Sequence, residues 1–317
     1  MYHLLQQAAN MLQAADDIAI IIHNRPDGDA IGSSHALYHA LRQLGKRVGV
    51  LCSDEAGRQF HCITKNQTIT ALDFEPRRVV LTDVSSFAQL GEQTAALAKR
   101  ADLVLDHHKV SDPICDTMLV DPTAAAAGEL IFALLRQMEV PLDQEIALAL
   151  YCALATDTGC FRFGNTTART HEIAAILMRT GIDVASFNKL FFETKSRARV
   201  LLEQAMLDSL SFHYRDTLAI AAVTLDMLAR CHAGEDETGQ ISNLTSEIEG
   251  VKVGVTIKQQ SASAFKISMR SVREIDVAEI CRQVGGGGHA QAAGCLLHGT
   301  LDEVVAQIVG LFAAVLP

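Results

Sequence analysis

The sequence predicts an α/β protein, in which a mainly parallel sheet with helices on both faces is followed by a smaller α/β domain. In the first half of the chain, short β-branched runs alternate with helical stretches, and this alternation is typical of a parallel sheet covered by helices. Beyond residue 210, strand-like runs appear again. Hydrophobic residues make up 49% and charged residues 20% of the 317 residues, so the chain can form packed cores.

The expected elements follow from the spacing of the apolar residues. The first fifteen residues have the pattern of a short amphipathic helix. In the first half we expect strands at 18–22, 48–52, 79–82 and 103–105, and helices at 34–44, 88–99 and 128–138, with further helices from 143 to about 210. In the second half we expect strands at 217–224, 251–258 and 265–270, and helices at 277–283 and 301–311. These elements predict a first domain over residues 1–195, a linker helix over 196–212 and a second domain over 213–317.

The composition limits the partners of the chain. A net charge of −10 argues against a protein that wraps long duplex nucleic acid, although bound divalent cations would still allow a short nucleotide. The sequence shows no targeting segment and no apolar run of membrane-spanning length, so we expect a cytoplasmic protein without a membrane partner. The eight cysteines form no CxxC pair, which favours free thiols in a reducing compartment.

The first candidate functional motif begins at His23, directly after an apolar strand. It contains Asp27 and Asp29, and it leads into a helix. Because Pro26 favours an extended residue before it, we expect the two aspartates to lie in an extended segment and to point the same way. We expect the N–H groups of Gly32 and Ser33 to be free at the helix start, where they would suit a phosphate. The alternative is a capped turn with solvated acids.

Two further strands end in similar residues. Asp83 directly follows the run 79–82, and Asp106, His107 and His108 follow the strand that begins near residue 103. A single aspartate after a strand is usually a turn residue, and a His-His pair is often only solvated. However, ligands bind at the carboxyl ends of the strands in open α/β sheets. Three strands that end in acids or histidines at one edge therefore indicate a functional site.

Asp157 ends the apolar helical run 146–155. A helix carboxyl terminus disfavours negative charge, so a nearby cation would explain an aspartate here. The alternative is a surface cap, with Gly159 ending the helix. Together, these carboxylates and imidazoles suit Mn²⁺ better than Ca²⁺ or Mg²⁺, and the set lacks the thiolates of a structural zinc site. Two ions about 3.5–4 Å apart could then hold a phosphoryl group, with one carboxylate bridging them.

The last candidate motif lies in the second domain. Residues Gly285 to Gly288 are four consecutive glycines, followed by His289, and we expect a helix to begin after them. Such a run lets the backbone approach an anion closely; the alternative is a flexible hinge. Arg270 ends an expected strand and could bind a phosphate with two hydrogen bonds, although an arginine at a strand end is usually solvated.

These motifs resemble the DHH phosphoesterase superfamily, through Asp106-His107-His108, and its branch with a DHHA1 C-terminal domain, through Gly285–His289. In length and layout the chain is similar to the NrnA-type oligoribonucleases and 3′-phosphoadenosine 5′-phosphate (pAp) phosphatases. The resemblance implies a catalytic DHH domain, a substrate-binding DHHA1 domain and two Mn²⁺ ions, with Mg²⁺ or Co²⁺ as substitutes.

The resemblance also implies a role for each candidate residue. His23 and Asp27 would bind one ion, Asp29, His107 and Asp157 the other, and Asp83 would bridge them. Asp106 would orient a histidine, and His108 would face the substrate phosphate. The substrate would further be bound by residues of the second domain, namely Arg270, Ser271, Gly286, Gly287, Gly288 and His289.

From this we expect a two-metal phosphoesterase that hydrolyses short oligoribonucleotides, pAp, or both. One alternative is a phosphodiesterase for linear or cyclic dinucleotides. A non-enzymatic alternative is a nucleotide-sensing module, but every ligand position is filled. The expected partner is short RNA or a small nucleotide, and a homodimer is left open.

Overall fold

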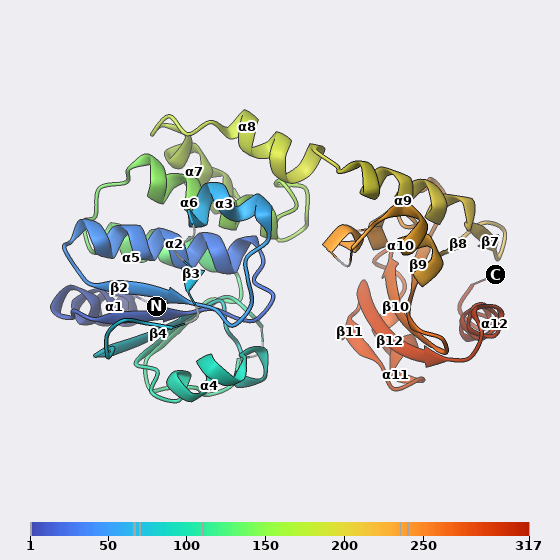
Figure 1. The fold of residues 1–317 in the computed structure, drawn as a ribbon, viewed down its shortest axis with the longest axis horizontal. Coiled ribbons are helices and arrows are strands. Elements are labelled where there is room, and N and C mark those ends of the chain that lie inside the picture. Colours follow the sequence, from blue (N-terminus) through green and yellow to red (C-terminus); the bar gives the residue numbers. More distant parts are fainter. Residues whose placement is uncertain are drawn as a thin grey trace. The chain divides into compact units, whose positions relative to one another are not determined.

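The computed structural model describes residues 2–65, 68–69, 71–109, 111–234, 236–239 and 241–316. The chain divides into two compact units, Met1–Thr194 and Lys195–Pro317, and both contain helices packed on a sheet, which confirms the predicted α/β class (Figure 1). Within the described residues, no helix is both long and apolar enough to cross a membrane.

The first unit contains most of the helices. Its strands are β1 (Ile18–Ile21), β2 (Val48–Leu51), β3 (Thr68–Ile69), β4 (Arg78–Thr82), β5 (Leu103–Asp106) and β6 (Met118–Val120). Its α-helices are α1 (Tyr2–Ala14), α2 (Gly28–Gln43), α3 (His61–Thr64), α4 (Glu92–Ala98), α5 (Ala127–Gln137), α6 (Gln144–Asp157), α7 (Ala168–Met178) and α8 (Val184–Asn188). Short helical turns are η1 (Arg58–Phe60), η2 (Phe87–Gln89) and the π-helical η3 (Lys189–Glu193).

The six described strands of this unit form one sheet in the order β3-β2-β1-β4-β5-β6, and every pair is parallel. Alternate residues of β1 point into different cores. Ile18 and Ile20 belong to the core formed with α1, α2, α5 and α6, whereas Ala19 and Ile21 belong to the core on the α4 face. Helices therefore cover both faces, as the sequence predicts, and strands buried on both sides have no polar alternation.

The second unit is smaller and its sheet is mixed. Its strands are β7 (Ser211–His213), β8 (Leu218–Val223), β9 (Val253–Ser261), β10 (Ala264–Ser271), β11 (Gly287–His289) and β12 (Ala292–His298). Its helices are α9 (Arg197–Asp208), α10 (Leu225–Cys231), α11 (Val277–Arg282) and α12 (Leu301–Leu311), with short turns η4 (Asp236–Thr238) and η5 (Ile241–Asn243). The strand order is β11-β12-β10-β9-β8-β7, in which only β8 and β9 pair in parallel.

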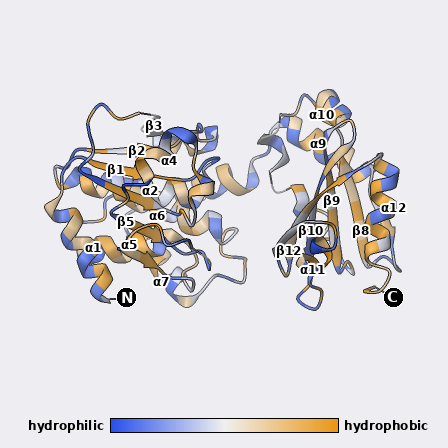
Figure 2. Cartoon of the chain, turned by 90° about the horizontal axis from the view of Figure 1, so that it is seen from below, coloured by the Kyte–Doolittle hydropathy of each residue, from blue (hydrophilic) through white to orange (hydrophobic). Residues whose placement is uncertain are grey.

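Two cores sandwich this second sheet. One face packs on α11 and α12, through residues such as Val277 and Ile308. The other face packs on α9 and α10, where Leu202 and Met206 of α9 are fully buried. Strand β8 of the second unit consists of hydrophobic residues alone (Figure 2), as does β1 of the first unit. The helix expected to be a linker thus contributes to the core of the second unit.

The glycine run differs from its predicted structure. No helix begins after it; instead Gly287–His289 form β11, which pairs antiparallel with β12. Gly288 has φ of 141°, and a Cβ atom there would lie 2.6 Å from the Ala292 carbonyl oxygen. Glycine is therefore required for this tight hairpin, and the prediction of a helix was wrong.

Candidate metal centre

The carboxyl ends of β1, β4 and β5 lie side by side, because these strands are neighbours in a parallel sheet. His23 follows β1, Asp83 follows β4, and Asp106 ends β5 with His107 after it. The structure brings these side chains together with Asp27, Asp29 and Asp157. Within the described residues, three overlapping groups each have ligand atoms that lie within 4.8 Å of one another. The groups are His23-Asp27-Asp83, Asp29-His107-Asp157 and Asp83-His107-His108.

Asp83 is shared between the groups, with one oxygen facing each histidine. Its Oδ2 lies 3.5 Å from His23 Nε2, and His23 Nε2 lies 3.8 Å from Asp27 Oδ1. Its Oδ1 lies 3.7 Å from His107 Nε2. That nitrogen is also 3.6 Å from Asp29 Oδ2 and 3.7 Å from Asp157 Oδ2. Asp83 thus lies where a bridging carboxylate would be needed.

These separations fit a shared cation better than direct hydrogen bonds. N···O separations of 3.5–3.8 Å exceed the usual hydrogen-bond range. Ligands about 2.1 Å from one ion lie about 3.0–3.4 Å apart, so a small inward movement would complete the coordination. Among the described residues, none donates a hydrogen bond to Asp83 Oδ1, although that oxygen is buried. A buried carboxylate oxygen without a donor is costly, so the donor set fits divalent metal ions.

Asp27 is held by the start of α2. The helix begins at Gly28, and the Asp27 carboxylate accepts hydrogen bonds from the N–H groups of Asp29 (3.1 Å) and Ala30 (3.0 Å). Asp27 is therefore an N-cap and Asp29 is helical, so the expected extended segment was wrong. The expected extended conformation of Arg25 was also wrong, because its φ is 49°. Asp27 itself is extended, as an N-cap residue usually is, and the helix begins directly after it.

Asp29 is fixed by a different helix. Its carboxylate accepts hydrogen bonds from the N–H groups of Ala127 (2.6 Å) and Gly128 (3.0 Å) at the start of α5, where the helix dipole favours an anion. Gly32 and Ser33 lie inside α2 and are buried, so their expected role as free phosphate donors was wrong. A Cβ at Gly32 would lie 2.4 Å from the Ala149 carbonyl oxygen. Gly32 instead allows α2 to approach α6 closely.

The remaining ligand candidates are also held by backbone structure. Asp83 has φ of 57°, a left-handed conformation that aspartate tolerates better than most residues. Asp157 is the last residue of α6. Asn165 Nδ2 donates to the carbonyl oxygens of both Asp157 and Ala125, each at 3.1 Å, and so ties the end of α6 to the segment before α5. The sequence contained no signal for this role of Asn165.

The carboxylates repel one another at this edge. Burial raises the pKa of Asp29 well above its usual range, and the neighbouring Asp83 and Asp157 raise it further. Burial also raises the pKa of Asp157 to about 6, against the opposing effect of His107. Burial disfavours the charged form of His23, but the neighbouring carboxylates of Asp27 and Asp83 outweigh burial and raise its pKa to about 11. Cations bound here would remove this repulsion.

Asp106 and His108 form a hydrogen-bonded pair at the edge of this cluster, where His108 Nδ1 also lies 3.6 Å from Asp83 Oδ1. Asp106 Oδ1 is 2.7 Å from His108 Nδ1 and accepts the N–H group of His107 at 2.9 Å. Asp106 also accepts the hydroxyl of Ser111. With Nδ1 engaged, Nε2 is the ring nitrogen left for a substrate, on a side chain that is 40% exposed. The hydrogen bond with Asp106 raises the pKa of His108, although burial opposes it.

Two candidate substrate residues of the second unit lie in register. Arg270 of β10 and His289 of β11 both pair with Ala292 of β12, and directly paired residues share a sheet face. Met269 packs in the core with α11 and α12, so Arg270 and His289 face the opposite side. Two strand spacings place their backbones about 10 Å apart. Burial lowers the pKa of Arg270.

Of the other candidate substrate residues in the second unit, two have structural roles and two are exposed. The Ser271 hydroxyl donates to the Ile275 carbonyl oxygen at 2.6 Å, so it has no proton left for a phosphate. A Cβ at Gly286 would lie 2.4 Å from the Gly294 carbonyl oxygen, which gives this glycine a packing role. Gly287 and Gly288 are exposed along β11.

Comparisons with known proteins identify both units. Residues 17–154 match the DHH family, N-terminal domain, and residues 220–314 match the DHHA1 domain. The bifunctional oligoribonuclease and PAP phosphatase NrnA of Thermus thermophilus is 30% identical over 320 residues, which cover 96% of this chain and 92% of the relative.

Solved structures share the fold. A crystal structure of an exopolyphosphatase-related protein from Bacteroides fragilis has a TM-score of 0.90 at 22% identity, covering 99% of this chain and 96% of that chain. A crystal structure of the exonuclease RecJ bound to manganese has a TM-score of 0.54 at 16% identity, covering 99% and 95%. The matched domains and the full-length relative confirm the resemblance noted in the sequence. The chain therefore belongs to the DHH family with a C-terminal DHHA1 domain, and it is a hydrolase that acts on phosphoester bonds.

Proposed function

We propose that this chain hydrolyses short oligoribonucleotides and pAp with two Mn²⁺ ions held in the first unit. The observation that carries the proposal is Asp83, whose two oxygens face two separate histidine-carboxylate groups. The names of relatives such as NrnA of Thermus thermophilus support this choice of substrates. The manganese in the RecJ structure supports the choice of ion; Mg²⁺ or Co²⁺ would substitute.

His23 and Asp27 would hold one ion, and Asp29, His107 and Asp157 the other, with Asp83 between them. When bound, the two ions would activate water and stabilise the charge that develops on the phosphoryl oxygens. The protein contributes a fixed ligand geometry, because backbone N–H groups already hold Asp27 and Asp29. Such preorganisation avoids reorganisation during the reaction.

His108 would act on the substrate directly. Because Asp106 binds Nδ1 and raises the pKa of His108, the imidazolium can donate a proton or a charged hydrogen bond from Nε2. A phosphoryl oxygen or a leaving oxygen is the natural acceptor. Asp106 would orient His108 rather than bind metal.

In the second unit, Arg270 and His289 would bind the part of the substrate away from the scissile bond. The planar guanidinium of Arg270 suits a phosphate, and it lies on one face of the sheet with the His289 ring. Two polar side chains on backbones about 10 Å apart suit a nucleotide with more than one phosphate.

The test is a substrate panel with Mn²⁺-loaded protein. It should contain pAp, RNAs of increasing length, linear and cyclic dinucleotides, pyrophosphate and polyphosphate. We expect phosphate release from pAp and stepwise shortening of the shorter RNAs. Turnover confined to dinucleotides would favour the dinucleotide phosphodiesterase alternative, and turnover confined to polyphosphate would refute the proposal.

A further inference from the structure

The segment between β6 and α5 supplies backbone atoms to two side chains of the metal centre. The Ala124 carbonyl oxygen lies 3.3 Å from His107 Nδ1. At the end of the same segment, the N–H groups of Ala127 and Gly128 bind the Asp29 carboxylate. The position of residues 121–129 therefore determines the orientation of His107 and Asp29.

A single guanidinium joins the two ends of this segment. Arg169 of α7 places Nη1 and Nη2 each 3.2 Å from Asp121 Oδ2. Its Nε donates to Glu129 Oε2, at 2.5 Å. Asp121 begins the segment and Glu129 lies in the first turn of α5, so Arg169 fixes both against α7.

Both carboxylates are buried and have further hydrogen bonds. Asp121 is 9% and Glu129 3% exposed. Asp121 Oδ1 accepts the hydroxyl and the N–H group of Thr123, at 2.6 and 3.0 Å. The buried Thr170 hydroxyl donates to Glu129 Oε1 at 2.6 Å. Although burial acts in the opposite direction, the bonds with Thr123 and Arg169 lower the pKa of Asp121.

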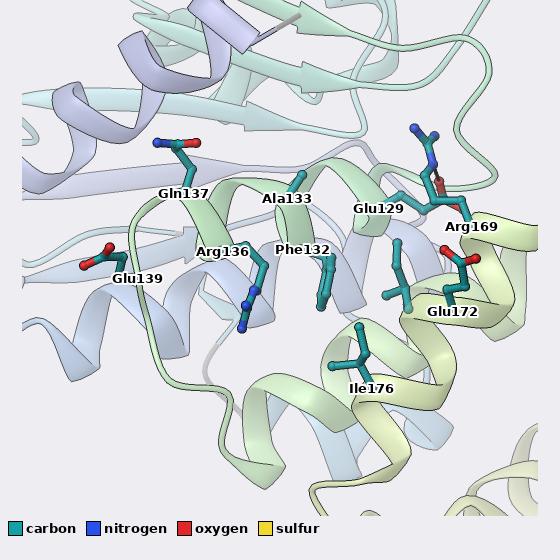
Figure 3. A pocket seen from close by; sticks show the side chains of 10 residues that line it. Glu129, Phe132, Ala133, Arg136, Gln137, Glu139, Arg169, Glu172 and Ile176 are labelled. Carbon is teal, nitrogen blue, oxygen red and sulfur yellow. Dashed lines mark hydrogen bonds and ion pairs between the residues drawn. The ribbon is translucent and has the colours of Figure 1, made fainter.

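The side chain of Arg169 is 47% exposed. It lies beside Glu129 at one end of a groove of about 630 Å³ between α5 and α7 (Figure 3). Arg136 lines the same groove about two helical turns further along α5. A small cation could therefore reach the position of the Arg169 side chain in a variant that lacks it. Arg136 provides a control arginine in the same groove.

We propose that Arg169 is a positioning residue of the metal centre, which holds residues 121–129 so that Ala124 and the start of α5 orient His107 and Asp29. The inference rests on the metal centre proposed above. Groups that orient metal ligands typically change metal affinity about 10–100-fold when they are removed. Arg169 acts through the backbone of the segment, so we expect an effect near 10-fold.

The test measures Mn²⁺ binding by isothermal titration calorimetry on chelator-stripped protein, without substrate. Arg169→Ala should bind Mn²⁺ about 10-fold more weakly, and Arg136→Ala should bind it as wild type does. Added guanidinium ion should enter the groove and partly restore the affinity of Arg169→Ala. Arg169→Lys, which keeps the charge but not the forked donor geometry, should be intermediate. The visible absorption of the Co²⁺-loaded protein should change in Arg169→Ala if the ligands are displaced.

Folding must be separated from positioning, because Arg169→Ala removes the cation that contacts both buried carboxylates, Asp121 and Glu129. The double variant Glu129→Gln with Arg169→Gln removes the more deeply buried of the two charges, while Asp121 keeps its hydrogen bonds with Thr123. This variant should fold while still binding Mn²⁺ more weakly. Wild-type affinity in either folded variant would overturn the inference, as would the unfolding of both variants, which would make the role of Arg169 purely structural. If wild-type protein bound no divalent cation, the proposed metal centre itself would fail.

Discussion

Replacing Asp157 with asparagine should stabilise the metal-free protein at alkaline pH, although the change removes a proposed metal ligand. Burial and neighbouring carboxylates raise the pKa of Asp157 from 3.8 to about 6. Because one pKa unit corresponds to about 1.4 kcal/mol, ionised Asp157 costs the folded protein about 3 kcal/mol. Asparagine has a similar shape and cannot ionise, so Asp157→Asn should recover most of this free energy of unfolding.

The gain should depend on pH. Since the folded pKa is raised, the stability associated with neutral Asp157 is fully present below pH 3.8 and is lost as the pH rises through about 6. In chelator, the variant and wild type should therefore have equal stability below pH 3.8 and differ most above pH 6. A hundredfold excess of Mn²⁺ over Kd should narrow this difference, because wild type gains about 2.7 kcal/mol and the variant gains less.

Differential scanning calorimetry would measure this effect. For a unit of this size, about 3 kcal/mol corresponds to a rise in Tm of about 6–12 °C. The exposed Asp116 provides the control, since Asp116→Asn should change neither Tm nor its metal dependence. A Tm for Asp157→Asn at or below wild type in chelator at pH 8 would refute the electrostatic reasoning. A gain of the same size at pH 3 would refute it as well.

Three further predictions concern catalysis and packing. Asp83→Asn keeps a residue that tolerates φ of 57°, so the circular dichroism spectrum should not change. The variant should nevertheless lower kcat more than about 100-fold, because the bridging carboxylate is lost. Near-normal turnover would exclude the bridging role. Arg270→Ala should raise KM about 10–100-fold with little change in kcat. Lys266→Ala, on the same sheet face, should change neither constant. Steady-state kinetics with pAp as the substrate would measure both variants. Gly32→Ala should lower the free energy of unfolding by about 1–3 kcal/mol, because the new methyl group meets the backbone of α6. Gly310→Ala in α12, where nothing lies within 4 Å of the new atom, should instead raise it by about 0.4–1 kcal/mol in denaturant titrations.

The strand ends of the first unit could be predicted from sequence, because the signal is local. Apolar runs that stop at Asp83 and Asp106 mark the carboxyl ends of β4 and β5, and parallel strands bring such ends to one edge. The convergence of Asp157 with them could not be predicted from spacing alone. It depends on α6 packing against α2, which is a contact between distant segments.

Other features of the fold could not be predicted from the sequence, because local preferences compete there or because the contacts are long-range. Helix α2 begins at Gly28, earlier than the expected helix at 34–44, because Pro26 and Gly28 mask the N-cap signal of Asp27. The glycine run gave no turn type, since glycine permits both a helix cap and the hairpin that the structure contains. The bonds from Ala127 and Gly128 to Asp29, and from Arg169 to Asp121 and Glu129, join segments far apart in the chain. The spacing of apolar residues along the sequence carries no information about such contacts.

The hold that backbone N–H groups have on Asp27 and Asp29 has a consequence for the choice of ion. Both carboxylates are fixed by helix starts, so they have little freedom to rotate and offer further oxygen ligands. Calcium needs six to eight oxygen ligands, whereas this set includes the imidazole nitrogens of His23 and His107. The site should therefore discriminate against calcium by the number and kind of its ligands.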